Sequence, residues 1–150
     1  MKKLICALLA VFILLSFTGC GTRSYEDTNG EDDYSLQTIT EADIIRGIGS
    51  SIFMSSTVRN NHVTVCTART MSGVAKLFEL DLNGEDLDLT VSCSITKGNA
   101  RLVLVINDEI VHDFGLKGMN QNFTLENVTG AVSLRIAGEN TGYSIKYELK

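Results

Sequence analysis

A two-residue alternation of apolar and polar side chains dominates the second half of the sequence. It is clearest from Leu87 to Ile95, where Leu, Leu, Val, Cys and Ile fall at every second position and Asp, Thr, Ser and Ser lie between them. Successive side chains of a strand point to opposite faces of a sheet, so this segment predicts a strand with one buried and one solvated face. The alternation returns in residues 131–137 and 143–149. We therefore expect antiparallel strands.

Short segments rich in glycine and asparagine separate the alternating runs. Asn83-Gly84 is typical of a two-residue β-hairpin, whose central positions both need a positive φ. Runs and breaks together predict about eight strands, at the spacing of an all-β fold, an antiparallel and jelly-roll-like β-sandwich. The expected strands are residues 62–70, 74–82, 86–96, 100–106, 109–114, 121–127, 131–137 and 143–149.

Residues 41–60 are ambiguous between a short helix and irregular strand. Thr40 and Asp43 approximate a capping box, which predicts a helix that begins at Thr40. Gly47 and Gly49 would end it within two turns, near Arg46.

The first nineteen residues have the layout of a secretion signal. Lys2 and Lys3 precede an apolar run from Leu4 to Phe17 that only Ser16 interrupts. About 14 apolar residues, at about 1.5 Å each, fall short of the roughly 30 Å hydrocarbon core of a bilayer. Cleavage after residue 19 is therefore expected, rather than a transmembrane anchor.

Residues 17–20, Phe-Thr-Gly-Cys, resemble the lipobox of bacterial lipoproteins, in which a small residue precedes the cysteine that receives a diacylglycerol. Phe17 departs from the usual Leu. The resemblance implies a Cys20 carrying diacylglycerol and palmitate, which anchors the chain on the extracytoplasmic side of the cell membrane or the outer membrane. Two or more acyl chains give stable anchoring. The alternative is an ordinary secretory signal with a chance cysteine.

Residues 20–40 are polar and acidic, which predicts a flexible tether and leaves residues 41–150 as one β-sandwich domain. Removing Lys2 and Lys3 leaves eleven basic and eighteen acidic side chains, a net charge of −7. Such a chain repels phosphate, so nucleic acid is not an expected partner. A flexible segment has no preset cation-binding geometry, which argues against a site formed by Glu26, Asp27, Glu31, Asp32 and Asp33.

Oxygen-rich side chains around the expected hairpin form the best metal candidate. Asp81, Asn83, Asp86 and Asp88 could ligate Ca²⁺. The spacing differs from an EF-hand, because Gly84 is fourth rather than sixth in this run. The alternative is that these acids are the polar face of the next strand.

Cys66 and Cys93 are the cysteines that remain once Cys6 is removed and Cys20 is acylated. An exported pair can oxidise, so a disulfide between the first and third expected strands is one hypothesis. Buried free thiols are the other, since strict alternation places Cys66 on the face opposite Val63.

Side chains for catalysis are scarce, and no cofactor is indicated. His62 and His112 are far apart and lack the paired spacing of zinc ligands. His112 and Asp113 could form half of a triad, but no Gly-x-Ser-x-Gly elbow accompanies them. The chain has no Trp, and Tyr143 and Tyr147 alternate on the expected core face. We therefore do not expect an enzyme.

The stretch from Ala75 to Lys150 resembles the small jelly-roll-like modules of bacterial surface lipoproteins and secreted enzymes. Runs such as Lys-Leu-Phe-Glu-Leu-Asp-Leu and Gly-Tyr-Ser-Ile-Lys-Tyr-Glu-Leu carry the resemblance, which assigns no binding residue. The sequence favours a non-catalytic, membrane-anchored binding or adhesion module for a protein or glycan. The alternatives are an inhibitor or accessory subunit of an envelope or secreted enzyme, and a small hydrolase. For the subunit, Leu116 and Met119 are either exposed loop anchors or residues that pack within the loop.

Overall fold

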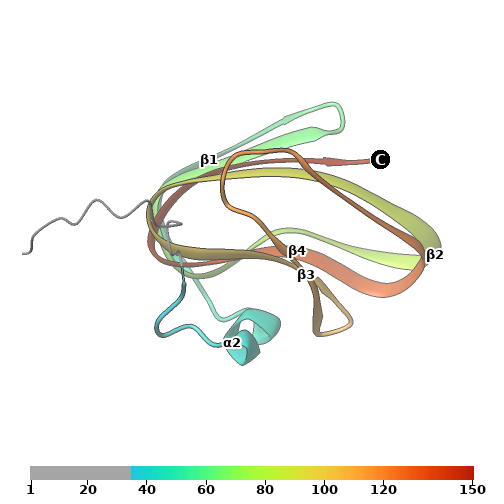
Figure 1. The fold of residues 1–150 in the computed structure, drawn as a ribbon, viewed down its shortest axis with the longest axis horizontal. Coiled ribbons are helices and arrows are strands. Elements are labelled where there is room, and N and C mark those ends of the chain that lie inside the picture. Colours follow the sequence, from blue (N-terminus) through green and yellow to red (C-terminus); the bar gives the residue numbers. More distant parts are fainter. Residues whose placement is uncertain (1–34) are drawn as a thin grey trace, which may run out of the picture. The chain divides into compact units, whose positions relative to one another are not determined.

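The computed structural model describes residues 35–150. They form one helix, α2 (Glu41–Arg46), followed by the strands β1 (Ser51–Asn60), β2 (Val63–Ile106), β3 (Glu109–Phe114) and β4 (Gln121–Leu149) (Figure 1). The expected signal peptide (1–19), Cys20 and the tether acids at positions 26–33 lie outside the described residues. Within residues 35–150 no helix has the length and apolar character needed to cross a membrane.

The strands stack as two layers, and β2 and β4 run through both. All strand pairs are antiparallel. In the first layer the neighbouring segments are, in order, β1, residues 63–71 of β2, 143–149 of β4, 89–95 of β2 and 121–125 of β4. In the second layer the order is 73–83 of β2, 129–138 of β4, 97–106 of β2, and β3. The expected antiparallel β-sandwich is confirmed.

The long strands change layer at corners where the sequence predicts turns. Asn83-Gly84 is such a corner and not a hairpin: Asn83 pairs with Thr129, and the chain continues as strand. Gly84 has a φ of 81°, but Asn83 is not among the residues with positive φ, and the expected turn needs both. Two-residue hairpins lie at Asn61 and His62, between β1 and β2, and at Asn107 and Asp108, between β2 and β3. The φ angles of Asn107 and Asp108 are 49° and 61°.

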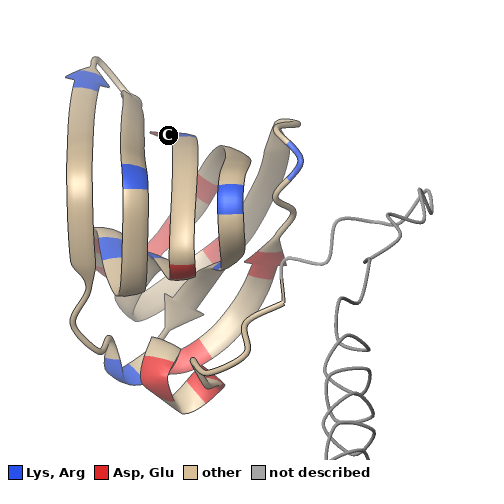
Figure 2. Cartoon of the chain, turned by 90° about the vertical axis from the view of Figure 1, so that its left-hand side faces the viewer, with Lys and Arg blue, Asp and Glu red and all other residues tan. Residues whose placement is uncertain are grey.

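Strand β1 lies in the region that the sequence leaves ambiguous. It pairs along its length with β2, from Ser51 opposite Ser72 to Asn60 opposite Val63. All ten residues are exposed, so β1 is an edge strand that buries little of its own surface. Arg59 is its single charged residue. Figure 2 shows how the basic and acidic segments are distributed over the strands and the helix.

The main core lies between the two layers. The alternation of residues 87–95 is confirmed, because Leu87, Leu89, Val91 and Cys93 are all buried while Ser94 is exposed. Opposite them, the second layer contributes further fully buried aliphatic side chains, Leu102, Leu104, Leu134 and Ile136.

Helix α2 packs on the outer face of the second layer, which the alternation alone would leave wet. Ile44 is fully buried there in a second apolar cluster with Val103, Val105 and Ala137. The capping box is confirmed: the Thr40 hydroxyl accepts from the Asp43 amide, and the Asp43 carboxylate accepts from Thr40. Gly47 ends the helix in the left-handed conformation.

Arg135 shows why this outer face is not solvated. The sequence assigns Ser133 and Arg135 to a wet face, but both are buried beneath α2. The Arg135 guanidinium donates to the carbonyl oxygens of Ile44 and Ile45 and to the Ser133 hydroxyl. A cation at a helix C-terminus satisfies carbonyls that have no partner in the helix. The sheet therefore binds the helix through a polar contact as well as an apolar one.

The folded domain begins before the expected boundary at residue 41. Leu36 and Ile39 are half-buried and pack against the cluster beneath α2. We call residues 36–40 the strap. The sequence places them in the tether because residues 37–39 contact the domain through Glu139, about 100 positions away.

Candidate functional site

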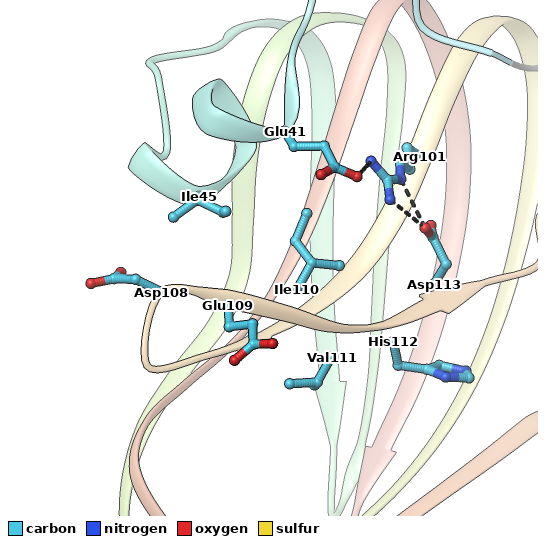
Figure 3. Close-up of a pocket in the computed structure, with 9 residues that line it drawn as sticks. All are labelled: Glu41, Ile45, Arg101, Asp108, Glu109, Ile110, Val111, His112 and Asp113. Carbon is cyan, nitrogen blue, oxygen red and sulfur yellow. Dashed lines mark hydrogen bonds and ion pairs between the residues drawn. The ribbon is translucent and has the colours of Figure 1, made fainter.

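A cleft lies between α2 and β3 on the outer face of the second layer. Its cavity volume is about 440 Å³. Figure 3 shows its walls, which come from the helix, from β2 and from the hairpin that leads into β3. The lining residues are Glu41, Ile45, Arg101, Asp108, Glu109, Ile110, Val111, His112 and Asp113.

Arg101 is held between two carboxylates at one side of this cleft. Its Nε donates to Asp113 Oδ2 at 2.8 Å, and its Nη1 donates to Glu41 Oε1 at 2.9 Å. The hydrogen bond to Asp113, with a smaller contribution from Glu41, raises the pKa of Arg101 above its ordinary value. The guanidinium side chain is 30% exposed and its partners are more open, so the network is accessible to a ligand. Side chains from α2 and β3 thus hold the planar guanidinium of Arg101, which comes from β2.

Apolar side chains lie beside this network. Ile110 is half-buried against the cluster beneath α2, and Val111 is 38% exposed. The cleft therefore combines an aliphatic patch with fixed donors and acceptors. Its lining holds four carboxylates and one guanidinium, so it is acidic overall.

His112 and Asp113 do not form a catalytic pair. Figure 3 shows Asp113 directed towards Arg101 and His112 directed away from it. The His112 ring packs against Phe114 and Phe123, with ring centroids 4.6 and 4.7 Å away. Adjacent residues of a strand face opposite sides, so the pair cannot converge on one substrate atom. His62 is exposed beside the β1–β2 turn, far along the chain from both.

The calcium candidates are spread along one edge of the sandwich. Asp81 pairs with Ala131, and Asp88 lies opposite Thr124. The Asp86 carboxylate accepts a hydrogen bond from the Asn127 amide at 3.0 Å. No three His, Cys, Asp or Glu side chains gather as a metal site anywhere in residues 35–150. The Asp86 carboxylate therefore has a structural contact, which agrees with the alternative that these acids belong to the polar side of the strands.

Cys66 and Cys93 are free, buried thiols. Both pair with Ile145, one from each side, so a strand of β4 lies between them. Neighbouring strands are about 4.8 Å apart, which puts the two Cα atoms at roughly 10 Å, beyond the reach of a disulfide. Burial raises the pKa of the Cys93 thiol to about 12. The hypothesis of buried thiols describes this structure, and the disulfide does not form in it.

Some of the aromatic and loop candidates are buried in the structure, and others are exposed. Tyr143 and Tyr147 are buried, as expected for core residues. In the loop between β3 and β4, Leu116 packs against the main core, whereas Met119 is 72% exposed. Met119 is thus the exposed apolar side chain of that loop.

Sequence reasoning missed Arg101 and Glu41, which form the ion pair that lines one side of the cleft. Arg101 alternates with Val103 and Val105, so the pattern shows which face it shares. No signal in the sequence places α2 over that face.

Comparisons with known proteins find resemblance in solved structures alone. No family model matches the sequence, and no curated protein matches it. A cupin domain from Bordetella pertussis is 12% identical, with 65% of this chain and 92% of that chain covered and a TM-score of 0.33. The carbohydrate-binding module CBM36, solved with calcium and xylotriose, is 14% identical over 69% of this chain and all of its own, with a TM-score of 0.35.

A third structure, TmCBM61 with β-1,4-galactotriose, is 13% identical over 77% of this chain and 99% of its own, with a TM-score of 0.36. At such scores the likeness carries no argument about ligand or activity. The cleft must be interpreted from its own residues.

Proposed function

We propose that this protein is a non-catalytic binding module, lipid-anchored outside the cell membrane, and that the cleft between α2 and β3 holds a glycan. One observation supports the ligand class: Arg101, fixed by Glu41 and Asp113, lies beside the aliphatic surface of Ile110 and Val111. Ligand sites combine apolar surface with a few fixed polar groups that orient the ligand. Sugars present both C–H faces and vicinal hydroxyls.

The charge of the cleft narrows the class of glycan. The lining of the cleft holds four carboxylates and one guanidinium, so an acidic sugar would meet repulsion. A neutral glycan pays no such cost, and its hydroxyls can both donate to carboxylates and accept from Arg101. We therefore propose neutral oligosaccharides.

Calorimetric titration with a panel of neutral oligosaccharides tests this function. Arg101→Met keeps the length of the side chain and removes its donors. A hydrogen bond to a charged group contributes roughly 1.5–3 kcal/mol, so the dissociation constant should rise at least about tenfold. Lys146→Met, an exposed cation on β4 outside the cleft, is the matched control. Absence of binding by the unaltered chain, or equal loss in both variants, would refute the proposal.

The lipid anchor rests on residues 17–20 and is tested separately. Cys20→Ala should abolish labelling by radioactive palmitate and prevent the shift to the mature mass. A wild-type chain that carries no lipid label while staying membrane-bound through an uncleaved signal would contradict the anchor.

Exposed apolar residues favour a second candidate function, an accessory or inhibitory subunit that binds another protein. Phe53, Met54 and Val58 of edge strand β1 are 63%, 62% and 59% exposed, and Met119 is 72% exposed. An open sheet edge can accept a further strand from a partner. Val58→Lys should then weaken capture of a purified envelope enzyme while leaving oligosaccharide binding unchanged.

A further inference from the structure

The strap and α2 are bound to β4 at both ends. Arg135 donates to the carbonyls of Ile44 and Ile45, near the helix C-terminus. Glu139, four residues further along β4, accepts from the strap ahead of the helix. A cation therefore meets carbonyl oxygens and an anion meets N–H groups. The cation lies at the helix end that carries partial negative charge, and the anion lies ahead of the end that carries partial positive charge.

The Glu139 carboxylate receives five hydrogen bonds from three consecutive residues. The Gln37 amide donates to both carboxylate oxygens at 3.1 and 2.9 Å, and the Thr38 amide donates at 2.5 Å. The Thr38 hydroxyl and the Ile39 amide add bonds of 2.7 and 3.1 Å. Ordering this strap costs conformational entropy, which these charge-assisted bonds and the packing of Ile39 offset.

The strap leads directly into the proposed site. Thr40 caps the helix, and Glu41, the first helical residue, forms the ion pair with Arg101. The position of the Glu41 carboxylate therefore depends on where the strap is held. Since α2 has only six residues, it is too short to be stable without such contacts.

We infer that Glu139 is a positioning residue for the cleft: by holding residues 37–39 it places Glu41 against Arg101. The inference rests on the proposed function for its biological meaning, but the coupling itself can be measured without a ligand. It makes the junction between tether and domain part of the binding site.

Acid should weaken this coupling, because protonation of the Glu139 carboxylate removes its charge. The hydrogen bonds from the strap lower the pKa of Glu139 to about 2. Among the described residues that line the hollow around it, Glu139 is the one with a titratable side chain.

The test follows the guanidinium signals of Arg101 by NMR in the full chain, held in detergent micelles. Glu139→Gln should shift these signals as Glu41→Gln does, and should raise amide exchange in residues 37–47 at least tenfold. Glu139→Asp, which keeps the charge, should restore part of both effects. Glu148→Gln, another β4 carboxylate, is the matched control and should do neither.

Unchanged Arg101 signals in Glu139→Gln overturn the inference. So do changes that spread equally through the amides of β2 and β4, because these would reflect general destabilisation. The proposed function fails by a different result: an unaltered chain that shows the expected coupling and binds no neutral oligosaccharide.

Discussion

The guanidinium Nη1 of Arg135 lies 2.8 Å from the carbonyl oxygen of Ile44, a residue 91 positions earlier in the chain. Arg135 is 7% exposed and Ile44 is fully buried. The contact joins a helix of six residues to the middle of a sheet. It explains how a charged residue comes to occupy the interior of an otherwise apolar interface.

Arg135→Met should therefore release α2 from the sheet. The substitution leaves the carbonyls of Ile44 and Ile45 without their donor, at a cost of about 1–3 kcal/mol of unfolding free energy. Urea denaturation measures this loss, and Lys146→Met on the exposed side of β4 should change stability by less than about 0.5 kcal/mol. Equal midpoints for the two variants would contradict the role assigned to Arg135.

Acid should weaken the strap before it weakens the sandwich. The folded-state pKa of Glu139 is depressed from 4.5 to about 2. Its contribution to stability is therefore complete above about pH 4.5 and is lost as the pH falls towards 2. The protection of the residue 37–39 amides, measured as exchange relative to the intrinsic rate at each pH, should fall over this range in the unaltered chain. In Glu139→Gln the same amides should be unprotected at every pH, and a preserved acid-dependent loss of protection would exclude Glu139 as its source.

The two buried thiols should stay reduced and unreactive. Because burial raises the pKa of Cys93 to about 12, thiolate is scarce at neutral pH. A soluble chain beginning at Gly21 should show two free thiols after unfolding in denaturant and almost none that react while it is folded. Its melting temperature should be insensitive to reducing agents. A drop on reduction would reveal a disulfide between Cys66 and Cys93.

Gly98 and Gly84 should differ in their tolerance of a methyl group. Both have positive φ, +72° and +81°, so alanine is strained at either position by roughly 1–2 kcal/mol. At Gly98 a Cβ would also lie 2.4 Å from the carbonyl oxygen of Asn140, whereas nothing lies within 4 Å at Gly84. The urea midpoint should fall clearly further for Gly98→Ala than for Gly84→Ala. A larger fall for Gly84→Ala would show that the backbone around Gly98 can move away from the added methyl group.

The sequence predicts local structure well wherever a local cause determines it. Strand β3 coincides with its predicted range of residues 109–114, and the capping box at Thr40 forms as the spacing indicates. Alternation correctly assigns Leu89 and Val91 to the core. These features depend on residues within a few positions of one another.

Connections between distant segments could not be predicted in this way. Gly84 supplies a positive φ to a corner as readily as to a hairpin, and the choice depends on pairing with β4 more than forty residues later. The sequence does not decide between helix and strand for β1, because its residues are exposed on both faces and show no alternation. The cleft was missed for a related reason, since Glu41 reaches Arg101 across sixty residues of sequence.

The last segment of the chain is also a central one. Residues 143–149 lie between 63–71 and 89–95, so the first layer is divided in two until they are in place. Such pairing between distant segments makes folding slow and leaves incomplete chains without a stable core. Until residues 143–149 pair, the two halves of the first layer have no strand between them, so the sandwich cannot close before this segment joins it.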